Sequence, residues 1–429
     1  MTETTTLTGA TLPDGRVRNV VLRHGAVSHV SPVGIPDLGQ AAIDLTGYLL
    51  LPAPAEPHLH LDRALSWEPV GSDPDGRDGA VRSWRAAPTR YGVADLRRRA
   101  RATLQELSAN GVTSVRTHVD FGVGAPLRVI EVLRELREDL QRVLDLQIVA
   151  VASPGLSDRA ALDAFAAGAA LLGGRPHSSP DPRGETRRLL RLADRAEVDL
   201  DLHLDDQPDH RVLAVADLAR LLRASGFGRQ VTASHCASLG MLRPPALAKV
   251  VEAIAASRMA VVGLPSAPRG DSRMDALTDT RTDRGFRGLA PCGGPASLHA
   301  LLDAGVPFAA GGDHLRDALH TMGRGDALEV ASLLVATGNL SVEQAYAAVS
   351  SDARRIMGLP DAGPEPGAVA DLLAVRASSL AEAVLTAPRD RIVLRRGRVV
   401  SRTTAAGRGS GRTRATIGRQ RTRVPAGAR

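Results

Sequence analysis

Short apolar segments alternate with amphipathic segments through the middle of this 429-residue chain, and this alternation constrains the fold more than any other feature. Amphipathic stretches such as 95–110, 185–196 and 295–305 precede several of the apolar segments. Eight segments have the length and composition of buried strands, and they lie near residues 50–60, 111–119, 145–151, 169–175, 198–204, 229–234, 259–264 and 306–312. Strands and helices that alternate eight times predict an α/β fold of the (β/α)8 barrel type.

Two β-rich stretches flank this central region. Near the start, the run RVRNVVLRHGAVSHV at residues 16–30 places apolar side chains on both sides of a turn, which predicts a β-hairpin. Similar runs return near the end of the chain. We therefore expect residues 1–50 and 357–400 to pair into one small β-sandwich domain, beside a barrel domain of residues 51–356.

The last stretch of the chain differs in composition from the rest. Residues 401–429 contain eight arginines, no acidic residue and few apolar side chains, so we predict a disordered Arg-rich tail. Subtracting these eight charges from the net charge of +7 leaves the remainder near −1. The body therefore lacks the positive charge typical of nucleic-acid binding, and the tail has no aromatic side chain to stack on bases.

The remaining composition indicates a reducing, cytoplasmic setting. Two cysteines make no disulfide framework. The N-terminus is polar and lacks the apolar region of a signal peptide. No apolar run reaches the length of a membrane span. We expect a cytoplasmic protein with no membrane partner and no nucleic-acid partner, and the sequence leaves open whether it forms a homo-oligomer.

Polar side chains follow the predicted strands at the ends where a barrel carries its chemistry. A lone histidine at a strand end is usually structural, whereas several that converge on one face of a barrel indicate a site. The residues at these ends are His58, His60, Thr117, His118, Asp120, His203, Asp205, Asp206, His235, Asp313 and His314.

His58 and His60 are the first indication of a metal site. Residues i and i+2 of a strand point to the same side, so both imidazoles can face one ion, and imidazole suits Zn²⁺ or Fe²⁺. A catalytic ion takes about three protein ligands and leaves a position for water, which ionises near neutral pH. His203 and Asp313, from strands across the barrel mouth, are candidates to complete the ligand set.

The motifs around these residues resemble those of a known family. They are LLLPAPAEPHLHLDRAL, GVTSVRTHVD, LQIVAVASPG, RPHSSPD, DLHLDDQ, VTASHC and GGDHLRDALHTMG, followed by the closing PEPGAVADLLAV. In this order they resemble the amidohydrolase superfamily, and specifically its cytosine deaminase branch, over nearly the whole chain to about residue 400. An ordered series of motifs is far more specific than the His-x-His pair alone.

The resemblance implies a role for each site residue. His58, His60, His203 and Asp313 would bind one divalent metal ion, Zn²⁺ or Fe²⁺. His235 would contact the water, and Asp313 would also accept a proton from it. Some amidohydrolases hold two ions bridged by a carboxylated lysine at the end of the fourth strand. The segment AALLGGRPHS has no lysine there, which favours a single ion.

Three positions depart from the cytosine deaminase pattern. Asp206 stands where those enzymes have a glutamate that shuttles protons, and its side chain is shorter by one carbon–carbon bond, about 1.5 Å. Ser153 aligns with the glutamine that recognises the pyrimidine edge. Leu319 aligns with a tryptophan that follows the eighth-strand aspartate. A site without its hydrogen-bonding residue selects a different substrate, so we expect a ring other than cytosine.

His118 has two interpretations of equal weight from the sequence. It could line the substrate pocket, or it could form a hydrogen bond behind the metal ligands that orients them.

The sequence as a whole predicts a metal-dependent hydrolase that acts on a C–N bond of a small molecule. The favoured reaction is hydrolytic deamination of an aminated nitrogen heterocycle by metal-activated hydroxide, with Asp206, His235 and Asp313 as the catalytic residues. The alternative reaction is hydrolysis of a cyclic or linear amide. A rival of another class is a metal-binding or ligand-binding pseudoenzyme, because Asp206 replaces the expected glutamate.

Overall fold

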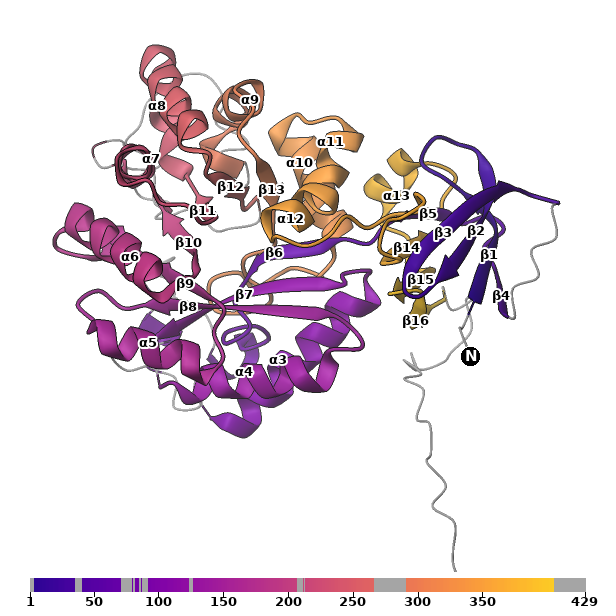
Figure 1. Ribbon diagram of the computed structural model, residues 1–429, viewed down its shortest axis with the longest axis horizontal. Helices are drawn as coiled ribbons and strands as arrows, with labels where there is room; N and C mark the ends of the chain where they lie inside the picture. Colours follow the sequence, from indigo (N-terminus) through magenta and orange to yellow (C-terminus); the bar gives the residue numbers. More distant parts are fainter. Residues whose placement is uncertain are drawn as a thin grey trace, which may run out of the picture.

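The computed structural model describes residues 4–34, 41–70, 79, 82–84, 86, 92–122, 126–206, 211, 213–265 and 291–404. Within these residues the chain forms a parallel sheet surrounded by helices and a separate mixed sheet built from both ends of the chain (Figure 1). The parallel sheet is the predicted barrel, and the mixed sheet is the predicted domain formed by the two ends.

The barrel strands follow one another in sequence order, and all of them are parallel. They are β6 (Ala55–Leu59), β7 (Ser114–Phe121), β8 (Asp145–Ala152), β9 (Leu171–Gly174), β10 (Asp199–Leu204), β11 (Val231–His235), β12 (Ala260–Gly263) and β13 (Phe308–Ala310). Each of the eight predicted segments overlaps one of these strands, so the barrel prediction is confirmed.

Short contacts between the first and last strands nearly close the barrel. The backbone N–H of His60 donates to the carbonyl of Asp313 (3.0 Å), and the N–H of Asp313 donates to the carbonyl of His58 (2.9 Å). Two residues before His58 in β6, the buried carboxylate of Glu56 accepts a hydrogen bond from the backbone N–H of Gly312 at 3.0 Å. A side chain thus replaces a ladder bond where β6 meets β13.

The helices lie mainly on the outside of the barrel (Figure 1). Local signals explain where they begin: the Asp181 carboxylate accepts from the N–H of Gly184 (2.9 Å) at the start of α6, where Pro182 occupies the first turn. The helices are α1 (Trp67–Val70), α3 (Val93–Ala109), α4 (Arg128–Leu140), α5 (Asp158–Ala167), α6 (Pro182–Ala196), α7 (Ala214–Ser225), α8 (Pro244–Ser257), α9 (Pro295–Asp303), α10 (Ala327–Gly338), α11 (Val342–Ala348), α12 (Ser351–Ile356) and α13 (Leu380–Thr386).

The mixed sheet joins the two ends of the chain. Its order is β16-β15-β14-β5-β1-β2-β3, with β4 paired to β1. Antiparallel pairing of Leu51 with Leu373 connects the early strands to the late ones. The strands are β1 (Thr4–Thr11), β2 (Val17–Arg23), β3 (Ala26–Pro32), β4 (Ala41–Asp44), β5 (Leu49–Pro52), β14 (Leu372–Val375), β15 (Arg391–Arg395) and β16 (Arg398–Thr403).

This sheet curls so that its two halves share a core. An isolated bridge between Ala26 and Val369 brings the β3 edge to the segment before β14. Leucines and valines from both ends then pack into one cluster, which includes Leu7, Val20, Leu22, Leu372, Ile392 and Leu394. The predicted hairpin is β2–β3, and its turn residues His24 and Gly25 both have positive φ, as a tight hairpin turn requires.

The chain crosses between the two sheets within a few residues. The predicted first segment, 50–60, is two strands: β5 ends at Pro52 in the mixed sheet, and β6 begins at Ala55 in the barrel. At the other end, β16 continues to Thr403. Residues 401–403, predicted to begin the disordered tail, instead belong to β16 and pair with β15. The rest of the predicted tail, beyond residue 404, lies outside the described residues, and the domain limits stay predictions.

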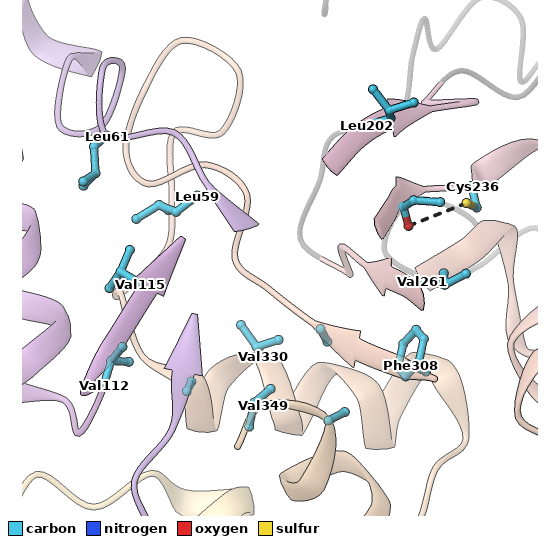
Figure 2. Close-up of a cluster of buried hydrophobic side chains, with 14 of the residues drawn as sticks. Leu59, Leu61, Val112, Val115, Leu202, Cys236, Val261, Phe308, Val330 and Val349 are labelled. Atoms are coloured by element: carbon cyan, nitrogen blue, oxygen red, sulfur yellow. Dashed lines mark hydrogen bonds between the residues drawn. The ribbon is translucent and has the colours of Figure 1, made fainter. Parts of the chain in front are cut away.

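Aliphatic side chains from several strands fill the core around the barrel, as expected for a chain with 2% aromatic residues. Figure 2 shows Leu59, Val115, Leu202 and Val261 among them. Cys236 lies in the same cluster, where its thiol donates to the Ala233 carbonyl at 3.9 Å. Burial raises the pKa of this thiol, which suits a packing residue rather than a nucleophile.

None of the described helices combines the length and apolar character needed to cross a lipid bilayer.

Candidate active site

The four predicted metal ligands come together at the carboxyl ends of the barrel strands. His58 lies in β6 and His60 just beyond it, His203 lies in β10, and Asp313 follows β13. All four side chains are almost completely buried, with exposed fractions between 0% and 2%. Strands far apart in the sequence thus supply one compact group of ligand atoms.

Distances within the group are short. His60 Nε2 lies 3.1 Å from His203 Nε2, and Asp313 Oδ1 lies 3.6 Å from Nε2 of both His58 and His60. The ligand atoms of His58, His60 and His203 lie within 4.8 Å of one another, and so do those of His58, His235 and Asp313. These spacings are compatible with one ion between the side chains.

Hydrogen bonds on the far side of the rings fix His58 and His60, whereas Nδ1 of His203 has no hydrogen-bond partner among the described residues. His60 Nδ1 donates to the carbonyl of His118, and His58 Nδ1 to the hydroxyl of Ser234, both at 2.9 Å. A carbonyl can only accept, so the hydrogen of neutral His60 resides on Nδ1 and Nε2 presents a lone pair. Among the described residues, His58 Nε2 and Asp313 Oδ1 have no hydrogen-bond partner. The donor set therefore fits a divalent metal ion.

Burial also prepares the imidazoles to bind a metal. It lowers the pKa of His58, His60 and His203 well below the ordinary value for histidine. Nearby positive groups, including Arg175, act in the same direction. Neutral imidazole is the form that binds a metal ion, so the rings do not need to lose a proton first.

A chain of polar groups runs from His58 toward the base of the barrel. Ser234 donates from its hydroxyl to Asp201 Oδ1 at 3.3 Å, and Arg116 Nη1 lies 2.8 Å from Asp201 Oδ2. Burial opposes ionisation of Asp201, but His118 and Arg116 together hold its pKa below the ordinary value. The network is anchored by a buried ion pair.

His118 packs behind the ligands. Its ring stacks on His58 with centroids 3.8 Å apart, and its Nε2 lies 3.2 Å from Asp201 Oδ1. The side chain is fully buried.

Backbone conformations at the strand ends are uncommon ones. Asp205, His235 and Asp313 have φ of 51°, 75° and 61°, in the left-handed region that non-glycine residues seldom adopt. Such backbone strain concentrates at functional sites, where surrounding contacts hold it in place. All three residues follow or end barrel strands.

Asp205 and Asp206 are neighbours with different surroundings. Asp205 accepts from the backbone N–H groups of Ala214 (2.9 Å) and Val215 (3.1 Å), so it caps the start of α7. Burial raises the pKa of Asp205 to about 6. Asp206 is also buried, and its Oδ1 lies 3.0 Å from Nε2 of His177.

The two predicted substrate positions outside the metal group lie in other contacts. Ser153 follows β8, and its hydroxyl donates to the carbonyl of Phe121 at 3.0 Å. Leu319 is partly buried in the segment after β13, where its backbone N–H donates to Asp317 Oδ1 at 2.8 Å.

The fourth strand supplies no side chain to the metal group. β9 ends with Gly173 and Gly174, and a Cβ on Gly173 would lie 2.8 Å from a methyl group of Val149 and 3.0 Å from the carbonyl of Asp201. Arg175 follows and forms an ion pair with Asp120. A side chain at Gly173 would therefore have to displace Val149 or the backbone of β10.

Asp120 is shared by two arginines at the barrel mouth. Arg63 and Arg175 each donate to one of its carboxylate oxygens. Burial opposes ionisation, but the two guanidinium groups lower the pKa of Asp120.

His314 extends the group of imidazoles on one side. Its ring stacks on His60 with centroids 5.0 Å apart, and its Nδ1 lies 2.7 Å from Asp317 Oδ2. Burial opposes a charge on His314, but the carboxylates of Asp313 and Asp317 outweigh burial and raise its pKa.

Sequence reasoning assigned no role to Ser234, Asp201, Arg116 or His177. The signal for Asp201 was present, because it precedes His203 by two residues and strand alternation puts both on one side. Ser234 pairs in register with His203, but that neighbour relation between strands appears only in the folded chain.

A parallel barrel with buried His and Asp side chains gathered at the carboxyl ends of its strands is typical of metal-dependent barrel enzymes. The sequence profile of the amidohydrolase family matches residues 76–408, and the chain belongs to that family. It is therefore an enzyme that acts on non-peptide C–N bonds, and the resemblance drawn from its motifs is confirmed.

Similar proteins extend over nearly the whole chain. A pterin deaminase of Rhizobium rhizogenes is 31% identical over 399 residues, which cover 90% of this chain and 88% of the relative. The structure of N-isopropylammelide isopropylaminohydrolase from Burkholderia multivorans has a TM-score of 0.78 at 27% identity, covering 93% of this chain and 98% of that one. The 5-methylcytosine deaminase from Klebsiella pneumoniae has a TM-score of 0.80 at 24% identity, over 94% and 99% of the chains. This last likeness concerns the fold.

Proposed function

We propose that this chain removes an exocyclic amino group from an aminated nitrogen heterocycle by hydrolysis. One observation carries the proposal: buried candidate ligands converge at one end of the barrel, and groups able to move protons lie at the same end, with Asp206 following β10 and His235 ending β11. A pterin deaminase that is 31% identical over 90% of the chain supports the same reaction.

His58, His60, His203 and Asp313 would hold one divalent ion, Zn²⁺ or Fe²⁺. Imidazoles with one carboxylate suit both metals. When bound, such an ion lowers the pKa of water and polarises the atom under attack. A single ion is proposed because the fourth strand ends in Gly173 and Gly174, which offer no side chain to bridge two ions.

The remaining residues would move protons. Asp313 would accept a proton from the attacking water, and His235, whose ring centroid lies 5.5 Å from that of His58, would orient that water. Asp206 would deliver protons first to the ring nitrogen and then to the leaving amine. Asp206, protonated at the start, would give its own proton to the ring nitrogen, then take the proton of the added hydroxyl group and pass it to the leaving amine, and the proton accepted by Asp313 would restore Asp206. The ring carbon thus gains the oxygen of water and loses ammonia, and both carboxyl groups return to their starting states.

The residues expected to surround the substrate argue against cytosine as the substrate. We assign Ser153 and Leu319 to this set; the Ser153 hydroxyl donates to Phe121, and Leu319 offers no aromatic face for stacking. We assign His118 to support of the ligands, because it is fully buried against His58. A pterin is therefore the first substrate to test.

The test combines metal analysis with a substrate screen. Purified protein should contain about one equivalent of Zn²⁺ or Fe²⁺, as expected for a mononuclear catalytic site. Ammonia release should then be measured with pterin, cytosine, aminotriazines and a creatinine-like ring. We expect turnover of pterin to exceed that of cytosine. A protein without bound metal, or full metal retention after replacement of His58 and His60 by alanine, would contradict the site assignment.

Two other outcomes identify the alternatives. Release of a carboxylate from cyclic or linear amides without ammonia release from any aminated ring would favour amide hydrolysis. Absence of turnover on every C–N substrate at full metal occupancy would favour a pseudoenzyme. The variant Asp206→Glu distinguishes a pseudoenzyme from a deaminase whose proton-carrying side chain is too short. A faster reaction in this variant would show that the reach of the carboxylate is limiting.

A further inference from the structure

His177 lies beside Asp206 because of the order of the barrel strands. β9 and β10 are parallel neighbours, with Gly174 paired to Leu202, so the residues that follow both strands meet at the mouth. Arg175 leads directly into a short 3-10 turn, Pro176–Ser178, that carries His177. Asp206 follows β10 by two residues.

The side chains of His177 and Asp206 lie close together, and His177 is more exposed to solvent than Asp206. His177 Nε2 lies 3.0 Å from Asp206 Oδ1, and the exposed fractions of the side chains are 23% and 2%. At this distance the imidazole attracts the carboxylate oxygen electrostatically, although the pair lacks the geometry of a hydrogen bond. The contact therefore disfavours rotamers that would carry this oxygen away from His177.

We propose that His177 is a positioning residue that holds the Asp206 carboxylate for proton transfer. The inference rests on the proposed function, in which Asp206 carries protons. A short aspartate has little reach to spare, and a misplacement of about 1 Å can cost about 100-fold in rate. A fixed rotamer keeps the carboxylate at the distance that the reaction needs.

Two variants at this position test the proposal with pterin as the substrate. His177→Ala should lower kcat by about 10–100-fold, the range expected for a misplaced proton-transfer group, while KM and metal content stay close to wild type. His177→Gln should recover most of the lost kcat, because its amide N–H can reach the Asp206 carboxylate and hold it in place. His299→Ala, at a partly buried histidine on α9, serves as the matched control and should leave kcat unchanged.

A double-mutant cycle separates positioning from general packing. In an Asp206→Asn background, His177→Ala should cost much less than it does in the wild type, since the group that it positions has lost its charge. Equal losses in both backgrounds would overturn the proposal. So would a His177→Ala variant whose kcat stays within about 2-fold of wild type, below the range expected for proton transfer.

A measurement without substrate tests the pair directly. In protein labelled with nitrogen-15 histidine, His177→Gln identifies the His177 imidazole signals, and Asp206→Asn should shift them. Should no ring be deaminated by wild-type protein, the proposed function fails, and this measurement alone decides the inference. Unshifted signals would then overturn it, and shifted signals would support His177 as the residue that holds Asp206.

Discussion

Two of the described regions of this chain contain buried charged or polar groups and differ in how completely those groups are paired. Between the barrel and the mixed sheet, Arg391 donates to both oxygens of Asp326 (2.9 and 2.7 Å) and to the carbonyls of Asn110 and Pro388 (2.7 and 2.6 Å). At the barrel mouth, His58 Nε2 and Asp313 Oδ1 have no hydrogen-bond partner among the described residues.

The difference sets a fully paired structural ion pair apart from the group of candidate metal ligands. A buried polar atom without a partner costs free energy, so a fold retains it only where something compensates. Arg391 and Asp326 satisfy each other and join β15 to the start of α10. The candidate ligands His58 and His60 have hydrogen bonds behind their rings. Among the described residues, His58 Nε2 and Asp313 Oδ1 have no hydrogen-bond partner in front, an arrangement that a bound ion would complete.

The largest effect should follow loss of a ligand. His60→Ala should abolish both metal binding and turnover, a greater loss than the about 10–100-fold expected when a supporting partner is removed. Metal analysis and ammonia release measure both. Wild-type protein treated with a chelator is the control, and its free energy of unfolding should be close to that of the variant. A variant that retains metal would place the ion elsewhere.

The next effect concerns the ion pair of Arg391 and Asp326, between the barrel and the mixed sheet. Arg391→Met should lower the free energy of unfolding by about 3–5 kcal/mol, since it leaves Asp326 buried without its partner. Metal content of the folded protein should not change. Adding Asp326→Asn removes the orphaned charge and keeps a capping side chain for α10, so the double variant should recover part of the stability measured by denaturant unfolding. An unchanged midpoint in the single variant would contradict this account.

A smaller effect should appear behind the ligands. Ser234→Ala removes the acceptor that holds His58 Nδ1, and metal affinity should fall about 10–100-fold. Ser350→Ala is the matched control, because this buried hydroxyl donates to the carbonyl of Tyr346 away from the site. Competition with a metal chelator should show a change in affinity for Ser234→Ala alone. Equal affinities for both variants would mean that Ser234 does not orient the ligand.

The smallest effect should depend on pH. Burial raises the pKa of Asp120, whereas the guanidinium groups of Arg175 and Arg63 lower it. The net effect is a lowered pKa. A carboxyl with a lowered folded pKa stabilises the fold above its unfolded pKa, about 3.9, and loses that contribution as pH falls through the folded value. Asp120→Asn should cost up to about 1 kcal/mol at neutral pH, as for partly exposed pairs, and the gap should shrink below about pH 4. A gap that widens in acid would contradict the assignment.

Much of the site followed from local sequence. Strand alternation placed His58 and His60 on one side of a strand, and the position of His203, His235 and Asp313 at predicted strand ends indicated a common mouth. The roles of Asp206, Ser153 and Leu319 came from the family resemblance and stay predictions. Contacts such as His177 with Asp206 depend on which strands are neighbours, which no local pattern states.

The sequence by itself determined the alternation of strands and helices, the pairing of both chain ends into one sheet and the family of the enzyme. These features depend on hydrophobic periodicity and on ordered motifs, both of which are local along the chain. Only the tertiary structure decided which polar atoms of the site have hydrogen-bond or ion-pair partners. It showed that Asp205 caps a helix while Asp206 meets His177, because the partners of a buried carboxylate come from segments that become neighbours only when the barrel forms.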